Sequence, residues 1–192
     1  MYGPPGTGKT LVTRRITQSF AATRDDFAAG YVNLKGCRTL SSAANETLFE
    51  LTGEKKQAHE GLDGIFEGIW AALEEYPERT VLLLDEIDHI KHSNYDPNDF
   101  FYRLLRGEGR LKRAISLSVW PISNELLKID LWLDSHVKNA MWVFFPPYKG
   151  AELIDVLAHG CGPPFAVMAC QMIRCGMDSP VQAHGGATLE KR

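Results

Sequence analysis

Short hydrophobic runs alternate with longer amphipathic stretches over residues 1–158. The runs have the length of buried strands, and they predict strands at 29–34, 80–84, 114–119 and 141–145. The longer stretches predict helices at 9–23, 41–51, 61–76, 97–106 and 150–158. This alternation is typical of βαβ units, so the chain is predicted to have an α/β fold, with a parallel sheet flanked by helices.

The predicted helix at 61–76 has a clear apolar face. Its hydrophobic side chains recur at helical spacing, at Leu62, Ile65, Ile69, Leu73 and Tyr76. We therefore expect one face of this helix to pack on the sheet.

Composition narrows the class of protein. The chain has 192 residues, 44% of them hydrophobic, and a net charge of −3, which fits one globular domain and not a disordered segment. Its hydrophobic runs, such as 81–84 and 141–145, are far shorter than the roughly 18 residues of a bilayer span, so no membrane contact is expected.

The small net charge gives no whole-molecule argument for nucleic-acid binding, which would need a local basic patch. The start, MYGPPGTGKT, lacks the features of a secretory signal, and four cysteines do not make a disulfide scaffold, so a cytoplasmic location is expected.

The composition changes after about His159. Residues 159–192 hold three of the four cysteines and three of the five methionines, without a periodic element. We therefore separate a domain at 1–158 from an atypical tail at 159–192, which is either unstructured or the product of a shifted reading frame. A zinc site is disfavoured because no CxxC pair is present among its candidate ligands, Cys161, Cys170, Cys175 and His184.

The segment GPPGTGKT matches the phosphate-loop pattern GxxxxGK[ST] at every position. Glycines in such a loop let backbone N–H groups turn toward phosphate oxygens, and the following helix presents its positive end to the same anion. We expect Lys9 to reach the β- and γ-phosphates of ATP, and the Thr10 hydroxyl to hold Mg²⁺. The predicted cofactor-binding residues are Gly3, Pro4, Pro5, Gly6, Thr7, Gly8, Lys9 and Thr10.

Two polar segments follow predicted strands. VLLLDEIDHI at 81–90 ends in acids, which places carboxylates at the sheet edge where ligands of open α/β sheets bind. Asp85 suits the magnesium shell, and Glu86 suits the polarisation of an attacking water. Asn124, after the next strand, either hydrogen-bonds the γ-phosphate or that water, or is a plain loop asparagine. The predicted catalytic residues are thus Glu86, Asp85 and Asn124, and the predicted metal ligands are Thr10 and Asp85.

GPPGTGKT together with LDEIDHI resembles the AAA+ ATPases, which have a P-loop NTPase fold. The further segments YVNLKGCRTL, YRLLR, ISNELL, LDSHVK and VFFPPYKGAEL, in that order, resemble the archaeal replication initiators related to the first subunit of the origin recognition complex and to cell division control protein six. The resemblance covers about residues 2–158.

This resemblance implies an ATP-dependent switch that binds double-stranded origin DNA and helps to load the replicative helicase, with self-association as a further expectation. By the same resemblance, Asp85 and Glu86 are the acids of hydrolysis and Asn124 is the sensor. The segment 103–113 is rich in basic residues. It could contact DNA phosphates or a neighbouring subunit. The favoured interpretation is a solvent-exposed basic helix end.

The chain departs from the family pattern in four respects. Only Met1 and Tyr2 precede the loop, where relatives have an interior strand, so we expect the first strand to be largely missing. Pro121 is expected to disturb the end of a central strand, together with the bulky Trp120. His136 stands where relatives tend to have arginine. The lid segment and the winged-helix domain are expected to be absent.

These departures leave two further hypotheses beside an initiator ATPase. One is an inactive remnant or interaction module of the same family. The other is a different AAA+ loader or defence-type ATPase, which would share the first two motifs.

Overall fold

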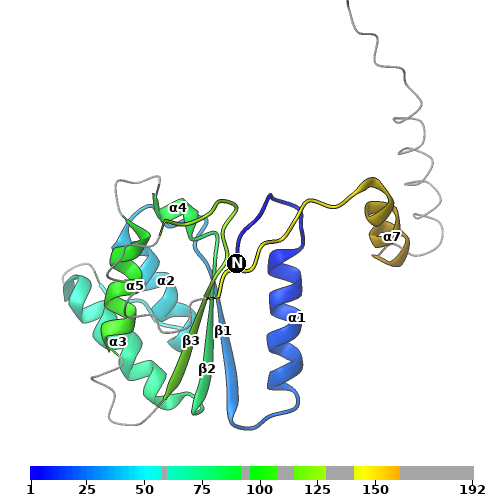
Figure 1. Ribbon diagram of the computed structural model, residues 1–192. Coiled ribbons are helices and arrows are strands. Elements are labelled where there is room, and N and C mark those ends of the chain that lie inside the picture. Colours follow the sequence, from blue (N-terminus) through cyan, green and yellow to red (C-terminus); the bar gives the residue numbers. More distant parts are fainter. Residues whose placement is uncertain (58–59, 92–95, 108–114, 129–140, 161–192) are drawn as a thin grey trace, which may run out of the picture. The chain divides into compact units, whose positions relative to one another are not determined.

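The computed structural model describes residues 1–57, 60–91, 96–107, 115–128 and 141–160 (Figure 1). The chain divides into two compact units, Met1–Pro147 and Tyr148–Arg192. The first unit holds the sheet with its helices, and the described part of the second is mainly one helix, α7 (Gly150–Gly160).

Helices and strands alternate in the first unit as an α/β fold requires. Its elements are α1 (Lys9–Ala21), β1 (Phe27–Asn33), α2 (Leu40–Thr52), α3 (Gly61–Glu75), β2 (Arg79–Asp85), α4 (Asp88–Lys91), α5 (Pro97–Arg106) and β3 (Ser116–Pro121). The three strands form a parallel sheet in the order β1-β2-β3. The predicted α/β class and parallel sheet are confirmed, with most boundaries shifted by one or two residues.

Local capping explains why some boundaries were predictable. Helix α5 begins at Pro97, as expected, because the Asp96 side chain accepts a hydrogen bond from the Asn98 N–H and proline suits the first helical position. Helix α2 begins one residue before the expected start. There the Thr39 and Ser42 side chains cap each other's backbone N–H groups, which is a capping box.

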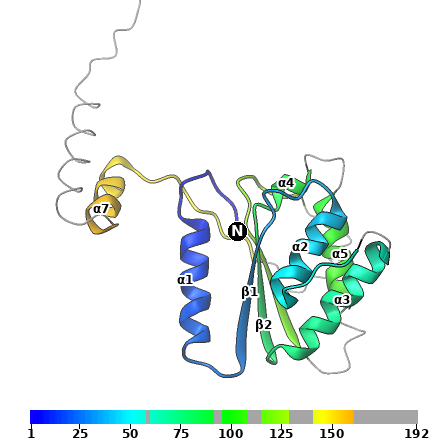
Figure 2. The ribbon, with the colours of Figure 1, turned by 180° about the vertical axis from the view of Figure 1, so that it is seen from behind.

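The sheet separates two layers of helices. Helix α1 covers one face, and α2, α3 and α5 lie on the other (Figures 1 and 2). Strand β2 is buried on both faces because its side chains alternate between the layers, so Leu82 and Leu84 join the core on the α2 side.

Helix α3 contributes its apolar face to that same core. Ile65, Ile69 and Leu73 are at most 1% exposed, and Leu62 and Tyr76 are partly buried against them, as the spacing predicted. Phe66 is also buried, and its ring packs against Phe100 of α5 with centroids 5.7 Å apart. The predicted face is therefore buried in the core but too narrow, because it also includes Phe66, and it packs against the helices α2 and α5.

A short ladder continues the sheet beyond β3. Tyr2 forms isolated parallel bridges to Ser123 on one side and to Phe144 on the other. The Tyr2 N–H donates to the Val143 carbonyl (2.9 Å), and the Phe145 N–H donates to the Tyr2 carbonyl (2.9 Å). Tyr2 thus occupies the interior position between β3 and the segment around Phe144.

The predicted strand at 141–145 is wrong as a strand, because the segment forms only one bridge. Its hydrophobic composition predicts buried side chains, yet Met141 is 82% exposed and Phe144 is 53% exposed. The pairing ends where the partner segment turns at Gly3. Tyr2 supplies one N–H and one carbonyl to the ladder before Gly3 turns away into the loop.

The expected disturbance at Pro121 is also wrong. Strand β3 runs through Trp120 to Pro121, and the Ile122 N–H donates to the Leu84 carbonyl at 2.8 Å. In a strand, the N–H and carbonyl of one residue point to the same neighbour, and the Pro121 carbonyl accepts from the Met1 amino group at 2.7 Å. The missing N–H of Pro121 therefore faces Met1 and not β2, so the β2–β3 ladder is intact.

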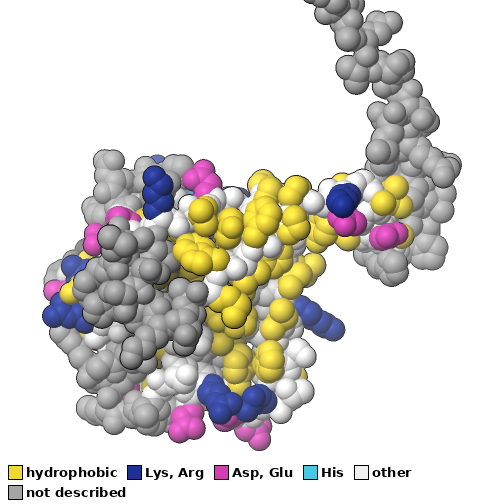
Figure 3. All heavy atoms as spheres, in the orientation of Figure 1, with side chains coloured by type: hydrophobic (Ala, Val, Ile, Leu, Met, Phe, Trp, Pro, Cys, Tyr) yellow, Lys and Arg dark blue, Asp and Glu magenta, His cyan; other side chains and the backbone are white. Residues whose placement is uncertain are grey.

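Hydrophobic side chains gather on the face of the molecule shown in Figure 3. The exposed large hydrophobic residues include four on α1 and three after β3: Leu11, Val12, Ile16, Phe20, Met141, Trp142 and Phe144. Among the described residues, no helix is both long and apolar enough to cross a membrane.

Candidate functional site

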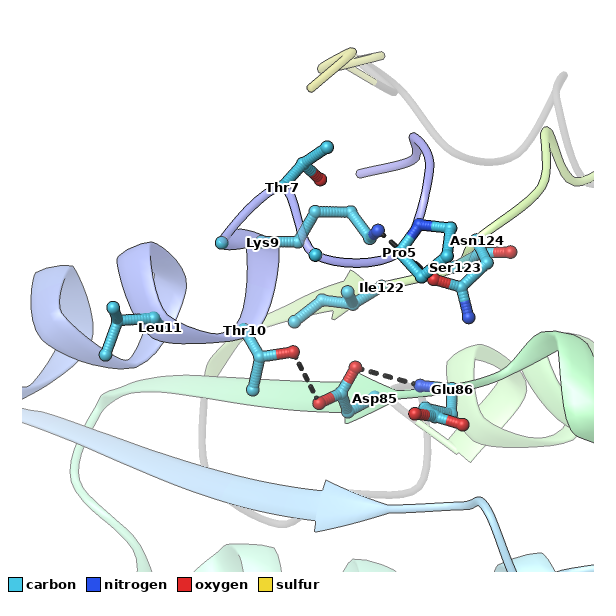
Figure 4. Close-up of a pocket in the computed structure, with 12 residues that line it drawn as sticks. Pro5, Thr7, Lys9, Thr10, Leu11, Asp85, Glu86, Ile122, Ser123 and Asn124 are labelled. Carbon is cyan, nitrogen blue, oxygen red and sulfur yellow. Dashed lines mark hydrogen bonds between the residues drawn. The ribbon is translucent and has the colours of Figure 1, made fainter. Parts of the chain in front are cut away.

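A cavity of about 370 Å³ opens where the loop before α1 meets the carboxyl ends of β2 and β3 (Figure 4). Such an edge is where open parallel sheets bind ligands. The cavity is lined by Pro5, Gly6, Thr7, Gly8, Lys9, Thr10, Leu11, Asp85, Glu86, Ile122, Ser123 and Asn124.

The loop turns into α1 through backbone conformations that need glycine. Gly8 is the N-cap of α1 with φ 78°, in the left-handed region. A Cβ on Gly3 would lie 2.2 Å from the Phe145 carbonyl oxygen, so only glycine lets the loop pass the segment around Phe145. The Thr7 hydroxyl closes the turn by donating to the Pro4 carbonyl at 2.9 Å. The loop therefore has a fixed shape, with the N-terminus of α1 at its end.

Lys9, the first residue of α1, is folded over the loop. Its ammonium donates to the carbonyls of Gly3 (2.7 Å) and Pro4 (2.9 Å) and to Asn124 Oδ1 (3.2 Å). The residue is 6% exposed, and burial lowers the pKa of Lys9, while the nearby carboxylates, above all that of Asp85, oppose the shift. The lysine is thus a desolvated cation held at the rim of the cavity, where an anion would replace uncharged oxygens as its partners.

Asp85 ends β2 and receives three hydrogen bonds. Thr10 donates its hydroxyl to Oδ2 at 2.8 Å, Tyr31 donates its phenol to the same oxygen at 2.9 Å, and the Glu86 N–H donates to Oδ1 at 3.0 Å. Asp85 is 5% exposed, so its charge is buried but well hydrogen-bonded. Burial, reinforced by Asp85, raises the pKa of Tyr31 to about 12, which keeps the phenol a donor.

Glu86 has an unusual backbone, with φ 55° in the left-handed region. Its carboxylate Oε2 lies 2.9 Å from Nε2 of His89, one helical turn onward. Next to it, the Asn124 N–H donates to Asp88 Oδ1 at 3.3 Å, which fixes the segment after β3 against α4.

The predicted site residues come together in one place. The loop from Pro5 to Thr10, Asp85, Glu86 and Asn124 all line the cavity, and the other two predicted residues, Gly3 and Pro4, accept hydrogen bonds from Lys9. In Figure 4 the Thr10 and Asp85 side chains point toward each other below the loop. The structure thus brings these side chains to one cavity, and their chemical roles are predictions.

Sequence reasoning missed two residues, Tyr31 and His89. Tyr31 lies in the middle of β1, where an aromatic residue is expected to belong to the hydrophobic core. Nothing in the strand pattern predicts its hydrogen bond to Asp85. His89 follows the acids by three residues, a spacing that becomes a contact only once α4 forms.

Several other predictions fall wholly or partly outside the described residues. These are His136, the disfavoured zinc ligands Cys161, Cys170, Cys175 and His184, and the part of the basic segment beyond Gly107. Within its described part, Arg103 pairs with Asp63 at 2.5 Å, and the Arg106 guanidinium donates to the Tyr102 hydroxyl at 2.6 Å.

The residues at the cavity fit a magnesium–triphosphate group. Thr10 and Asp85 bring a hydroxyl and a carboxylate oxygen within 2.8 Å of each other, and oxygen is the ligand type that Mg²⁺ prefers. No cluster of three or more His, Cys, Asp or Glu residues suited to a metal occurs in the described part of the chain. Mg²⁺ usually keeps water and phosphate oxygens in its shell and takes only one or two carboxylates from the protein.

Comparison with known proteins identifies the fold family. The family model described as an AAA domain matches residues 1–117. ORC1-type DNA replication protein 8 of Haloarcula marismortui is 30% identical over 173 residues, which is 83% of this chain and 38% of that protein.

Solved structures show the same fold. The Aeropyrum pernix ORC1 protein in complex with DNA matches with a TM-score of 0.65 and 22% identity, over 88% of this chain and 48% of that one. The Aeropyrum pernix ORC2 protein in its ADPNP-ADP complexes matches with a TM-score of 0.59 and 19% identity, over 81% of this chain and 43% of that one. The chain thus spans less than half the length of these relatives. It belongs to the AAA domain family, and its AAA domain is that of the archaeal ORC1/Cdc6 replication initiators, of which it covers a part.

Proposed function

We propose that this chain binds ATP with Mg²⁺ and hydrolyses it slowly, as the nucleotide switch of a replication initiator. One observation carries the proposal: the Thr10 hydroxyl lies 2.8 Å from the Asp85 carboxylate, beside a desolvated Lys9 at the N-terminus of α1. A helix N-terminus and a lysine favour phosphate oxygens, and the hydroxyl–carboxylate pair favours a divalent cation between them and the phosphates.

Each residue has a distinct role in this proposal. Backbone N–H groups of the loop hold the phosphates, Lys9 exchanges its contacts with Gly3 and Pro4 for β- and γ-phosphate oxygens, and Thr10 and Asp85 hold Mg²⁺. When bound, Mg²⁺ neutralises the charge that develops on the phosphates. Glu86 accepts a proton from the attacking water, and the Asn124 amide orients that water or the γ-phosphate.

At the level of the whole initiator, we propose that this switch controls binding to double-stranded origin DNA and loading of the replicative helicase. The support is the family and the Aeropyrum pernix relative, which was solved in complex with DNA. A bound nucleotide stabilises one conformation only through contacts that differ between conformations, so slow hydrolysis would serve as a timer.

A second function, nucleotide binding without turnover, is favoured by one observation. The Glu86 carboxylate is occupied by His89 at 2.9 Å, so the proposed base is engaged elsewhere. This would be the non-hydrolysing interaction module of the same family.

Measurement of ATP binding and of phosphate release by the full chain tests both functions. We expect Lys9→Ala to weaken binding of a fluorescent ATP analogue at least tenfold, because it removes the buried cation, while Lys35→Ala, an exposed lysine outside the cavity, leaves binding unchanged. Glu86→Gln should keep binding and lower hydrolysis about 100-fold. Equal and negligible binding by the unmodified chain and Lys9→Ala would refute the proposal, and binding without phosphate release would favour the second function.

A further inference from the structure

A tyrosine of the neighbouring strand supports the Asp85 carboxylate. The Tyr31 hydroxyl donates to Oδ2 of Asp85 at 2.9 Å, and the Thr10 hydroxyl donates to the same oxygen at 2.8 Å. The Glu86 N–H donates to Oδ1 at 3.0 Å (Figure 4). An ionised carboxylate has about four acceptor sites, so these three bonds use most of them. Because the donors come from α1, β1 and the turn after β2, the carboxylate cannot rotate without breaking a bond.

The register of the sheet explains why a tyrosine can reach this carboxylate. Tyr31 pairs with Leu83 in the parallel ladder, and Asp85 lies two residues further along β2, on the same face of the strand. From the rise of a strand and the spacing between strands, the Cα atoms of Tyr31 and Asp85 are about 8 Å apart. The hydroxyl at the far end of an aromatic ring spans this distance, whereas phenylalanine would fill the space without a donor.

Arg14 holds the Tyr31 ring in this position. Its guanidinium carbon lies 4.5 Å from the centroid of the ring, which is a cation–π contact. Arg14 follows Thr10 by four residues on α1, so both lie on the same face of that helix. Helix α1 thus supplies one donor to Asp85 directly, and it supports the other donor through Arg14.

A second cavity, of about 220 Å³, lies between α1 and β1, and both Arg14 and Tyr31 line it. The ring therefore has space on one side and is not fixed by close packing alone. The guanidinium over the ring opposes a movement of the ring into this space. The bond from Tyr31 to Asp85 thus depends on Arg14.

We propose that Tyr31 is a positioning residue of the magnesium site, that it holds the Asp85 carboxylate in the orientation the metal requires, and that Arg14 supports it. This inference rests on the proposed function, since it takes Asp85 as a magnesium ligand. Mg²⁺ demands near-ideal octahedral geometry, so a carboxylate that is free to turn binds it less tightly. Thr10 is itself a proposed ligand, whereas Tyr31 acts on the metal only through Asp85.

A magnesium titration of nucleotide binding tests this role without relying on hydrolysis. The full chain should bind a fluorescent non-hydrolysable ATP analogue more tightly as Mg²⁺ is added, and the readout is the Mg²⁺ concentration at half of this gain. Tyr31→Phe keeps the ring and removes the donor, so this concentration should rise about tenfold. The Kd for the analogue in EDTA should stay unchanged, because Tyr31 does not line the cavity at the phosphate loop.

Tyr76→Phe is the matched control for this substitution. It also removes a buried-end hydroxyl, one that donates to the Leu51 carbonyl at 3.2 Å, and Tyr76 does not line the cavity at the phosphate loop. It should leave the magnesium titration unchanged. Equal shifts in Tyr31→Phe and Tyr76→Phe would overturn the role of Tyr31, because a general loss of stability would explain both.

Arg14→Ala tests whether the ring must be held. The Mg²⁺ concentration should rise about threefold, as expected for the loss of one exposed cation–π contact. Loss of a positive charge would by itself favour a second cation, so the direction of the change reports on the ring. The double variant with Tyr31→Phe should match Tyr31→Phe alone, because Arg14 acts through the hydroxyl. Arg15→Ala, at the next and exposed arginine, should have no effect.

The outcomes separate this inference from the proposed function. A titration that is equal in the unmodified chain and Tyr31→Phe would overturn the positioning role alone. Additive shifts in the double variant would overturn the support by Arg14. Analogue binding that does not respond to Mg²⁺ in the unmodified chain would overturn the magnesium site itself, and the inference with it.

Discussion

The Lys9 ammonium donates a hydrogen bond of 3.2 Å to Oδ1 of Asn124, although 115 residues separate them in the chain. This bond joins the loop before α1 to the segment after β3 across the mouth of the cavity. The same ammonium is held by the carbonyls of Gly3 and Pro4, so Asn124 is one of three oxygen partners. Removal of Asn124 should therefore alter the position of the cation without releasing it.

Substitution Asn124→Ala should separate binding from hydrolysis. Because Lys9 keeps two carbonyl partners, the Kd for ATP should change less than about threefold, while kcat should fall about 10- to 100-fold through loss of the amide at the γ-phosphate. Parallel binding and phosphate-release assays check this, with the exposed Gln57→Ala as the control. A Kd that rises as much as kcat falls would contradict the separate role of Asn124.

Substitution at Thr10 should change the dependence on magnesium. Thr10→Ala removes the donor to Asp85 and one expected metal ligand, so the Mg²⁺ concentration at half-maximal hydrolysis should rise at least tenfold. Thr10→Ser keeps the hydroxyl and should stay within about threefold of the unmodified chain. Thr23→Ala, at an exposed threonine that donates to the Ser19 carbonyl, is the matched control. A magnesium dependence that is equal in Thr10→Ala and Thr10→Ser would argue against metal binding at Thr10.

The sequence could predict the parts of this site that depend on local pattern. The phosphate loop is contiguous, and Asp85 and Glu86 follow directly from the end of a buried strand, so spacing alone placed them at one sheet edge. Helix α5 was predicted with its observed boundaries because its cap and proline lie within three residues of each other.

The remaining features depend on pairing between distant segments, which composition does not encode. The hydrophobic segment 141–145 bridges Tyr2 just before the chain turns into the loop at Gly3, and Pro121 is harmless because its missing N–H faces Met1. Tyr31 reaches Asp85 only through the register that places Asn33 opposite Asp85, two residues further along β1. Such register relations follow from the assembled sheet.

The close approach of Gly3 to Phe145 predicts a large stability loss in Gly3→Ala. The added Cβ would lie 2.2 Å from a backbone oxygen, which can recede only if the bridge at Tyr2 breaks. We expect the free energy of unfolding to fall by about 2–3 kcal/mol, as measured by urea denaturation. Gly36→Ala is the matched control, since its Cβ would meet open space, and it should change stability by less than about 1 kcal/mol. Similar losses in both variants would show that the Phe145 contact is not tight.

Tyr31 predicts a specific loss of stability in alkali. The pKa of Tyr31 is raised to about 12 in the folded chain from 10.0, first by burial and then by its bond to Asp85, so folding favours the neutral phenol. The corresponding stability is fully present below pH 10, and it is lost as the pH rises through about 12. Tyr31→Phe should cost about 1 kcal/mol at neutral pH because Asp85 loses a donor, and the variant should lack this part of the alkaline loss. Urea denaturation across this pH range, with Tyr76→Phe as a second tyrosine whose pKa is also raised by burial, measures the difference. If Tyr31→Phe lost stability in alkali as steeply as the unmodified chain, the phenol would not be the group that titrates.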